Sequence, residues 1–201
     1  MPTVMTHAAF AFGLGRIFTA RRMPRVWFWD ILIVLSILPD LDILAFRLGI
    51  PYENPFGHRG FSHSLLFAWT VSLLAAVVCF RKCQVRFWDL WGLFFVSAAS
   101  HGLLDAMTNG GLGIAFFWPF DNERYFFPWQ PIEVSELGYH FFMSSRAWRT
   151  LGTELLWVWL PTAMVVGLIE LFPAVRSLWG EGAKNQTPAP VTSNSPSEPP
   201  A

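Results

Sequence analysis

The chain has 201 residues, of which 53% are hydrophobic and only 14% are charged. Soluble chains carry about 25% charged residues, so this composition excludes an ordinary soluble domain and predicts an all-α, polytopic membrane protein. The 14 Lys and Arg residues cancel the 14 Asp and Glu residues. The chain therefore has no net positive charge that would attract nucleic acid, and we expect no nucleic-acid partner.

Five apolar segments follow one another between short polar breaks. They cover about residues 8–18, 26–46, 61–80, 88–107 and 151–172. The last four approach the roughly 20 residues that a membrane-spanning helix needs, so we expect four to five membrane-embedded helices. Pro39 and Pro161 should kink or end the helices that contain them.

Residues 108–150 form a long linker between the fourth and fifth segments, rich in aromatic residues, Pro and Gly. Linkers of this length in a compact protein are usually functional or disordered, and the many large aromatic residues argue against disorder here. Residues 181–201 are rich in Pro, Ser, Thr and Asn, a composition typical of a disordered tail. We therefore expect one membrane-embedded domain over residues 1–180, followed by that tail.

The cations predict the orientation of the segments. If all five cross the membrane, nine cations lie on one side: Arg16, Arg21, Arg22, Arg25, Arg81, Lys82, Arg86, Arg176 and Lys184. The other five, on longer loops, are Arg47, Arg59, Arg124, Arg146 and Arg149. The positive-inside rule places the first side in the cytoplasm of a bacterial cell and the second in the periplasm.

The same topology gathers most of the ionisable residues of the apolar segments at the periplasmic side. They are His7, Asp40, Asp42, His58, His63, His101, Asp105 and Glu154. This convergence predicts one shared site near one face of the membrane. His140 stands alone in the linker, and Glu170 lies at the cytoplasmic end of the last segment, so both are left out.

The pair His101 and Asp105 carries the most specific signal. Residues four apart share one face of a helix and can bind one ion, and ionisable residues inside a membrane helix usually mark a functional face. The alternative is a His–Asp hydrogen bond that only stabilises helix packing.

The motif HRGFSHS holds His58 and His63, five residues apart, which is not a helical spacing. Gly60 permits a tight turn between them, and Ser62 is a candidate N-cap for the following helix. Such a turn would bring a loop histidine and a helix-start histidine together as metal ligands. Two merely exposed loop histidines are the alternative.

The remaining candidates are less specific. In LPDLD we favour one carboxylate, Asp40, as a ligand and the other, Asp42, as a general base or an orienting partner of a ligand. A solvated helix end is the alternative for both. His7 either joins the site or sits at the membrane interface, and Glu154 either completes the site or faces water.

The number and type of candidates indicate the metal chemistry. One catalytic zinc uses three protein ligands and a water, so eight candidates fit two metals, or one metal with an acid–base group and its supporting residues. The donors are nitrogen and carboxylate without thiolate, which suits Zn, with Mn and Fe as alternatives.

These motifs resemble a known family, the bacterial membrane-bound metal-dependent hydrolases, some of them described as LexA-regulated. The resemblance rests on MTHAAFAFGLG, LPDLD, HRGFSHS, SHGLLDAMTNGGLG and FWPFDNERYFFPWQPI, in that order. The family is distantly similar to the zinc-dependent phospholipase C group, whose His-x-x-x-Asp pair is matched by His101 and Asp105. Its His-x-x-x-Glu pair has no match here, so the resemblance assigns no partner to Glu154.

The linker offers groups for a substrate. Arg124 and Tyr125 are candidates for an anion clamp, since a guanidinium binds phosphate and a phenol donates a hydrogen bond. The alternative is an aromatic belt at the membrane interface, with Trp118, Trp129 and Tyr125 at headgroup level.

The sequence therefore predicts a membrane-bound hydrolase that uses one or two divalent metal ions, zinc first. Metal-activated water would attack an ester or phosphoester at the outer face of the inner membrane, and the site's depth indicates a membrane lipid or lipid-linked substrate. The predicted catalytic residues are Asp42 and Arg124. A metal or proton transporter with the same ligands, or a non-catalytic structural protein, are the alternatives.

Overall fold

The computed structural model describes residues 1–18, 26–83, 85–135 and 143–172. Within those ranges the chain contains helices and two isolated β-bridges but no strand, which confirms the all-α prediction. The main helices are α1 (Val4–Phe18), α2 (Val26–Ile37), α4 (Leu65–Cys79), α5 (Phe87–Ala106), α6 (Ser145–Glu154) and α7 (Leu160–Leu171). Short helical segments are η1 (Leu38–Ile43), α3 (Leu44–Arg47), η2 (Phe61–His63), η3 (Phe80–Lys82) and η5 (Leu155–Trp159).

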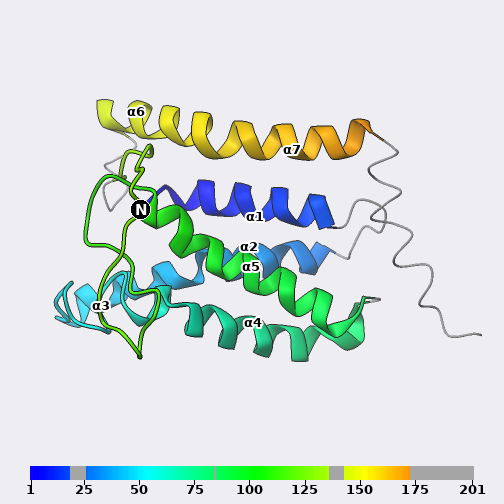
Figure 1. Ribbon diagram of the computed structural model, residues 1–201, viewed down its shortest axis with the longest axis horizontal. Helices are drawn as coiled ribbons and strands as arrows, with labels where there is room; N and C mark the ends of the chain where they lie inside the picture. The colour runs from blue at the N-terminus through cyan, green and yellow to red at the C-terminus, as the bar shows by residue number, and fades with distance from the viewer. Residues whose placement is uncertain (19–25, 84, 136–142, 173–201) are drawn as a thin grey trace, which may run out of the picture.

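The main helices run side by side along the long axis of the molecule (Figure 1). Helix α1 packs against α2, α5 and α7, and α4 packs against α5. As the chain alternates in direction, α3, the loop after α5 and the start of α1 all gather at one end of the bundle (Figure 1). We call this the loop end, and it holds the candidate site.

The two helix-breaking prolines have different effects. Helix α2 ends at Ile37, and Pro39 lies in the 3₁₀ turns of η1, as predicted. Pro161 does not end its helix: α6, η5 and α7 run on continuously from Ser145 to Leu171. The five residues before Leu160 form a π-helical turn, a common way for a helix to absorb a local disruption of its hydrogen-bond ladder.

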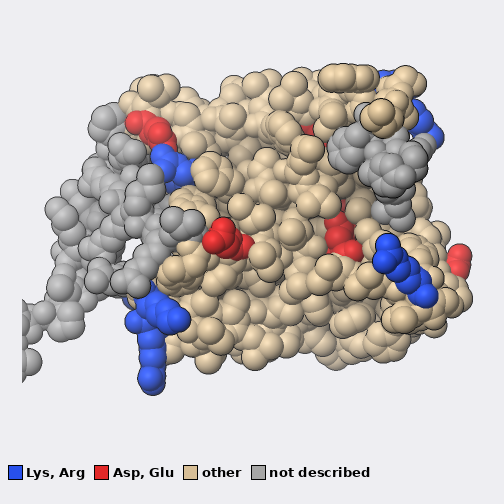
Figure 2. Space-filling view, turned by 180° about the vertical axis from the view of Figure 1, so that it is seen from behind, with Lys and Arg blue, Asp and Glu red and all other residues tan. Residues whose placement is uncertain are grey.

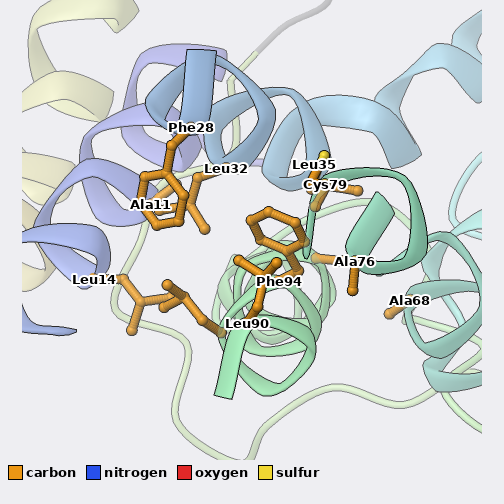
Figure 3. Close-up of a cluster of buried hydrophobic side chains, with 12 residues drawn as sticks. Ala11, Leu14, Phe28, Leu32, Leu35, Ala68, Ala76, Cys79, Leu90 and Phe94 are labelled. Atoms are coloured by element: carbon orange, nitrogen blue, oxygen red, sulfur yellow. The ribbon is translucent and has the colours of Figure 1, made fainter. Parts of the chain in front are cut away.

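An apolar core lies between α1, α2, α4 and α5, with Phe28, Leu32, Leu90 and Phe94 almost fully buried in it (Figure 3). Small residues such as Ala11 let the helices approach closely, which is the usual packing of helices in membranes. This core occupies the bundle away from the loop end and includes the thiol of Cys79.

One face of the bundle is largely uncharged. On the face shown in Figure 2, Lys and Arg side chains lie toward the two ends, and the surface between them is mostly uncharged apart from two acidic patches. Among the residues that the structure describes, two helices are long and apolar enough to cross a membrane, Leu65–Lys82 and Ser145–Leu171, and α1 is a shorter apolar helix. These features fit a helical membrane protein, and the number of crossings stays a prediction.

The packing of α1 against α7 depends on Gly13. A Cβ atom at this position would lie 2.2 Å from Cγ2 of Thr162, whereas nothing lies within 4 Å of a Cβ at Gly167 on α7. We expect Gly13→Ala to lower the free energy of unfolding by about 1–3 kcal/mol through overpacking. Gly167→Ala, the matched control, should raise it by about 0.5–1 kcal/mol. Denaturation in detergent checks both, and equal effects would contradict the packing role of Gly13.

Candidate metal centre

Four separate parts of the chain bring seven of the predicted residues together at the loop end. Helix α1 supplies one, η1 two, the segment before α4 two and α5 two: His7, Asp40, Asp42, His58, His63, His101 and Asp105. Most of their side chains are buried, and those of His7, His101 and Asp105 completely so. Gly60 makes the turn between the two loop histidines, since a Cβ there would lie 2.1 Å from the carbonyl oxygen of Pro55.

The two histidines His63 and His101 face each other through their Nε2 atoms, 3.0 Å apart. Nδ1 of His101 lies 2.7 Å from the carbonyl oxygen of Ser36, which can only accept a hydrogen bond. Nδ1 of His63 lies 3.1 Å from a carboxylate oxygen of Asp42. Both Nδ1 atoms therefore carry the proton, so the neutral rings point two Nε2 lone pairs at one another. Two facing lone pairs repel, and a proton or a metal ion at the Nε2 atoms would relieve that repulsion.

Two carboxylates border the same point. Asp40 Oδ1 lies 3.2 Å from Nε2 of His101, and Asp105 Oδ1 lies 3.4 Å from Nε2 of His7. The side-chain oxygens of both carboxylates and the ring nitrogens of His7 are buried. Among the described residues, they have no hydrogen-bond partner of regular geometry. Buried charges need partners of opposite charge. Arg59 lies beside Asp105, and a metal ion at the cluster would satisfy the remaining lone pairs together.

The donor set fits a divalent transition metal. Ligand atoms of His7, His101 and Asp105 lie within 4.8 Å of one another, and so do those of a second group, Asp40, His58 and His63. Imidazole nitrogen and carboxylate oxygen without thiolate are ligands for Zn, Mn or Fe. The residues present therefore fit the metal that the sequence predicts, in one position or in two adjacent ones.

Asp42 holds the two loop histidines. Its Oδ1 lies 2.6 Å from Nδ1 of His58, and its Oδ2 accepts from Ser62 Oγ at 2.6 Å and from the Arg59 backbone N–H at 3.1 Å, besides Nδ1 of His63. Burial raises the pKa of Asp42, but the hydrogen bonds with His58 and His63 outweigh it, so the pKa lies below its usual range. Of its two predicted roles, this geometry favours the orienting partner over the general base.

Ser62 is not the N-cap of the helix that follows, contrary to prediction. The cap is Ser64, whose hydroxyl accepts a hydrogen bond from the Phe67 backbone N–H at 3.1 Å. The Ser62 hydroxyl instead donates a hydrogen bond to the Asp42 carboxylate. Both serines precede the same apolar run, so residue type alone does not distinguish them.

Glu154 is fully buried at the loop end but is not among the clustered ligands. Its carboxylate accepts hydrogen bonds from the Thr3 backbone N–H at 2.5 Å and from the hydroxyls of Thr3 and Thr6 at 2.6 Å. These contacts tie the end of α6 to the start of α1. The prediction of a metal ligand does not fit this placement, because the oxygens already have their partners.

Glu154→Gln therefore tests its structural role. The amide replaces one accepting oxygen by a donor that faces the Thr3 and Thr6 groups, so we expect a loss of about 1–3 kcal/mol in unfolding free energy. Metal content should stay at the wild-type level, since no cluster atom is removed. Melting and elemental mass spectrometry on one preparation measure both effects. Loss of the metal from a protein that is still folded would return Glu154 to the ligand set.

Arg124 and Tyr125 do not form the predicted anion clamp. The Arg124 guanidinium donates to the carbonyl oxygens of His58, Tyr52 and Asn54 at 2.9–3.2 Å, and burial lowers its pKa. The Tyr125 hydroxyl donates to Asp121, and this hydrogen bond raises the pKa of the phenol. Arg124 thus braces the loop that carries His58, and its predicted catalytic role does not fit this geometry.

Arg59 is a site residue that the motif analysis missed. Its side chain is 1% exposed, with Nε 3.1 Å from Oδ2 of Asp105, and its other nitrogens donate to the carbonyls of Gly110 and Leu112 and to the hydroxyl of Thr108. The backbone adopts a φ of 63°, which is uncommon for a residue with a side chain. Its place between His58 and Gly60 was the available signal.

A buried His/Asp cluster at one end of an apolar helical bundle defines a helical membrane protein with a candidate metal centre. The sequence model of the YdjM inner membrane protein family matches residues 1–174, so the chain belongs to this family. It is 40% identical over 170 residues to inner membrane protein YbcI of Escherichia coli (strain K12), covering 84% of this chain and 97% of that protein. No solved structure matches the chain.

These names confirm the predicted inner-membrane class. They state a location and no activity, so the predicted metal-dependent hydrolase and its relation to the phospholipase C group remain to be tested. The predicted tail, residues 181–201, and His140 lie outside the described residues.

Proposed function

We propose that this chain is a membrane-bound metal-dependent hydrolase. The observation that carries the proposal is the contact between the Nε2 atoms of His63 and His101 beside the buried carboxylates of Asp40 and Asp105, whose oxygens accept no hydrogen bond of regular geometry. His7, His101 and Asp105 would hold one divalent ion, and Asp40, His58 and His63 would be within reach of a second, adjacent one. Zinc is the first candidate, and manganese and iron suit the same donors.

A bound divalent ion supplies hydroxide at neutral pH and stabilises negative charge on the scissile group. The protein's own part is to fix the donors. Asp42 and the Ser36 carbonyl hold Nδ1 of His63 and His101 in the protonated tautomer, so that both Nε2 atoms stay free to bind. The buried setting excludes bulk water, which strengthens every electrostatic interaction at the centre.

The structure supports a fixed centre over a transport path. A carrier needs polar groups through the membrane, but here the helices beyond the cluster enclose the apolar core of Leu14, Leu32, Leu90 and Phe94. The buried serines near it, Ser72 and Ser97, donate to backbone carbonyls. The next charged contact between helices is Arg16 with Glu170, at the far ends of α1 and α7.

In the proposed topology α1, α2, α4, α5 and the continuous helix α6–α7 all lie in the inner membrane, and the loop end faces the periplasm. The positive-inside rule supports this orientation, because Arg16, Arg81, Lys82 and Arg86 belong to the opposite end. The substrate would then be an ester or phosphoester reached from the outer leaflet, a membrane lipid or a lipid-linked molecule.

Metal content and product formation in detergent test the proposal together. We expect the purified chain to hold one or two equivalents of a transition metal and, in detergent, to release products from a bacterial lipid extract that mass spectrometry detects. Detergent removes compartments, so a transporter would bind metal but form no product. A chain that holds no metal after reloading under anaerobic conditions would overturn the proposal.

A further inference from the structure

An apolar groove of about 420 Å³ opens on the outside of the bundle at the loop end. Leu65, Leu66 and Trp69 of α4 form one wall, Phe95 of α5 contributes to the floor, and the aromatic segment 116–120 forms the rest. No charged side chain lines it. Leu66 and Trp69 are 41% and 43% exposed, so the groove is open to the surroundings of the bundle.

The groove lies directly behind the candidate metal centre. The Leu65 backbone N–H donates to the carbonyl of Phe116 at 3.0 Å, which joins the aromatic segment to the start of α4. Gly102 on α5 lies close to both, since a Cβ there would lie 3.1 Å from the His63 carbonyl oxygen and 3.3 Å from the Phe116 ring. The groove lining and the backbone of His63 therefore meet at this glycine.

The groove runs along the helix axes. Leu65 begins α4 at the loop end, and Trp69 lies about 6 Å further along at 1.5 Å per residue. Phe95 lies about 9 Å further from the loop end than His101 on α5, by the same rise. A ligand in the groove would thus extend from the aromatic segment at the membrane surface toward the membrane interior, as a lipid chain does.

The shape and lining favour a lipid chain over a helix of another protein. Helices in membranes pack through small residues that let their backbones approach closely. Here the lining residues are Leu, Phe and Trp. The groove also begins on one of the two helices that are long and apolar enough to span the membrane, in a chain of an inner-membrane family.

We propose that this groove seats one acyl chain of a bilayer phospholipid, with the headgroup at the aromatic segment beside the metal centre. The chain would hold the ester region of that lipid at the depth of the cluster. A phospholipid-type ester is then the substrate class of the hydrolase, and that last step rests on the proposed function.

Photo-crosslinking in vesicles tests the seat. The full chain is reconstituted in phosphatidylethanolamine and phosphatidylglycerol vesicles that contain a phospholipid with a diazirine in one acyl chain, and labelled peptides are mapped by mass spectrometry. We expect labelling to concentrate on the α4 start and on segment 116–120. Leu66→Trp should fill the groove and lower this labelling about tenfold. Leu168→Trp, on the exposed face of α7, is the matched control and should leave it unchanged.

Labelling that is spread evenly over the outer faces of α4 and α7, or that does not fall in Leu66→Trp, would contradict the acyl-chain site. It would indicate only the lipid that surrounds the protein. Labelling blocked by a co-purifying protein would assign the groove to a partner and contradict the acyl-chain site too. Metal content and melting temperature of the same samples separate the two proposals. Groove labelling in a protein without metal would contradict the hydrolase proposal alone. Bound metal without groove labelling would contradict the acyl-chain site alone.

Discussion

Asp105→Asn should weaken metal binding by at least about a hundredfold, because even the outer partners of metal ligands contribute 10–100-fold. The substitution keeps the shape of a fully buried side chain but removes the negative charge that faces His7 and Arg59. His101→Ala should have an effect of the same size, since it removes one Nε2 of the facing pair. Elemental mass spectrometry and titration with a competing chelator measure both.

The matched control is Asp89→Asn on the same helix. Asp89 is exposed and paired with Arg86 at the opposite end of α5, so its removal should leave the metal content unchanged. Wild-type affinity in folded Asp105→Asn would show that the carboxylate is not a ligand. The cluster would then be only a packing arrangement of polar groups.

Arg59→Lys should lower metal affinity about 10–100-fold, the size expected for a residue that orients a ligand. Lysine keeps the charge, but it cannot reproduce the fork that binds Asp105, Thr108 and the two loop carbonyls at once. Asp105 would then lose its fixed orientation. The visible spectrum of the cobalt-substituted protein should change as well, which a general loss of stability would not produce in the folded fraction.

Arg124→Lys is the control for Arg59. It also removes a guanidinium from backbone carbonyls of the loop, but no cluster carboxylate is in contact with it. We expect it to lower the melting temperature and leave the cobalt spectrum as in the wild type. An unchanged spectrum in both variants would show that Asp105 is positioned without Arg59.

Apolar run length and composition were enough to predict the helices, the bundle end that carries the site and the break at Pro39. They did not predict the start of the last helix at Ser145, because SRAWRT is polar. The buried side of this part of the helix carries Thr150 and Glu154, which do not stand out as an apolar pattern. Pro161 was predicted to kink or end its helix, and the helix passes it with a π-helical turn just before.

In the site, the helical spacing of His101 and Asp105 and the order of the other motifs indicated which residues meet. Spacing carries no information on hydrogen-bond partners, so it did not show that Thr3 and Thr6 would occupy Glu154, or that carbonyls would occupy Arg124. Arg59 was missed for a related reason. A buried arginine in a loop has no periodicity, and its role depends on Asp105, far away in sequence.

The cluster draws on the first helix, on η1, on the loop before α4 and on the end of α5, so its ligands emerge one after another during synthesis. In the proposed topology, His7 and Asp40 would enter the bilayer before Asp105, with their polar atoms unmatched. Assembly of the centre would then be a late event in biogenesis, completed when α5 inserts. Because the apolar core separates the cluster from the opposite end of the bundle, the metal would be loaded from the compartment that the loop end faces.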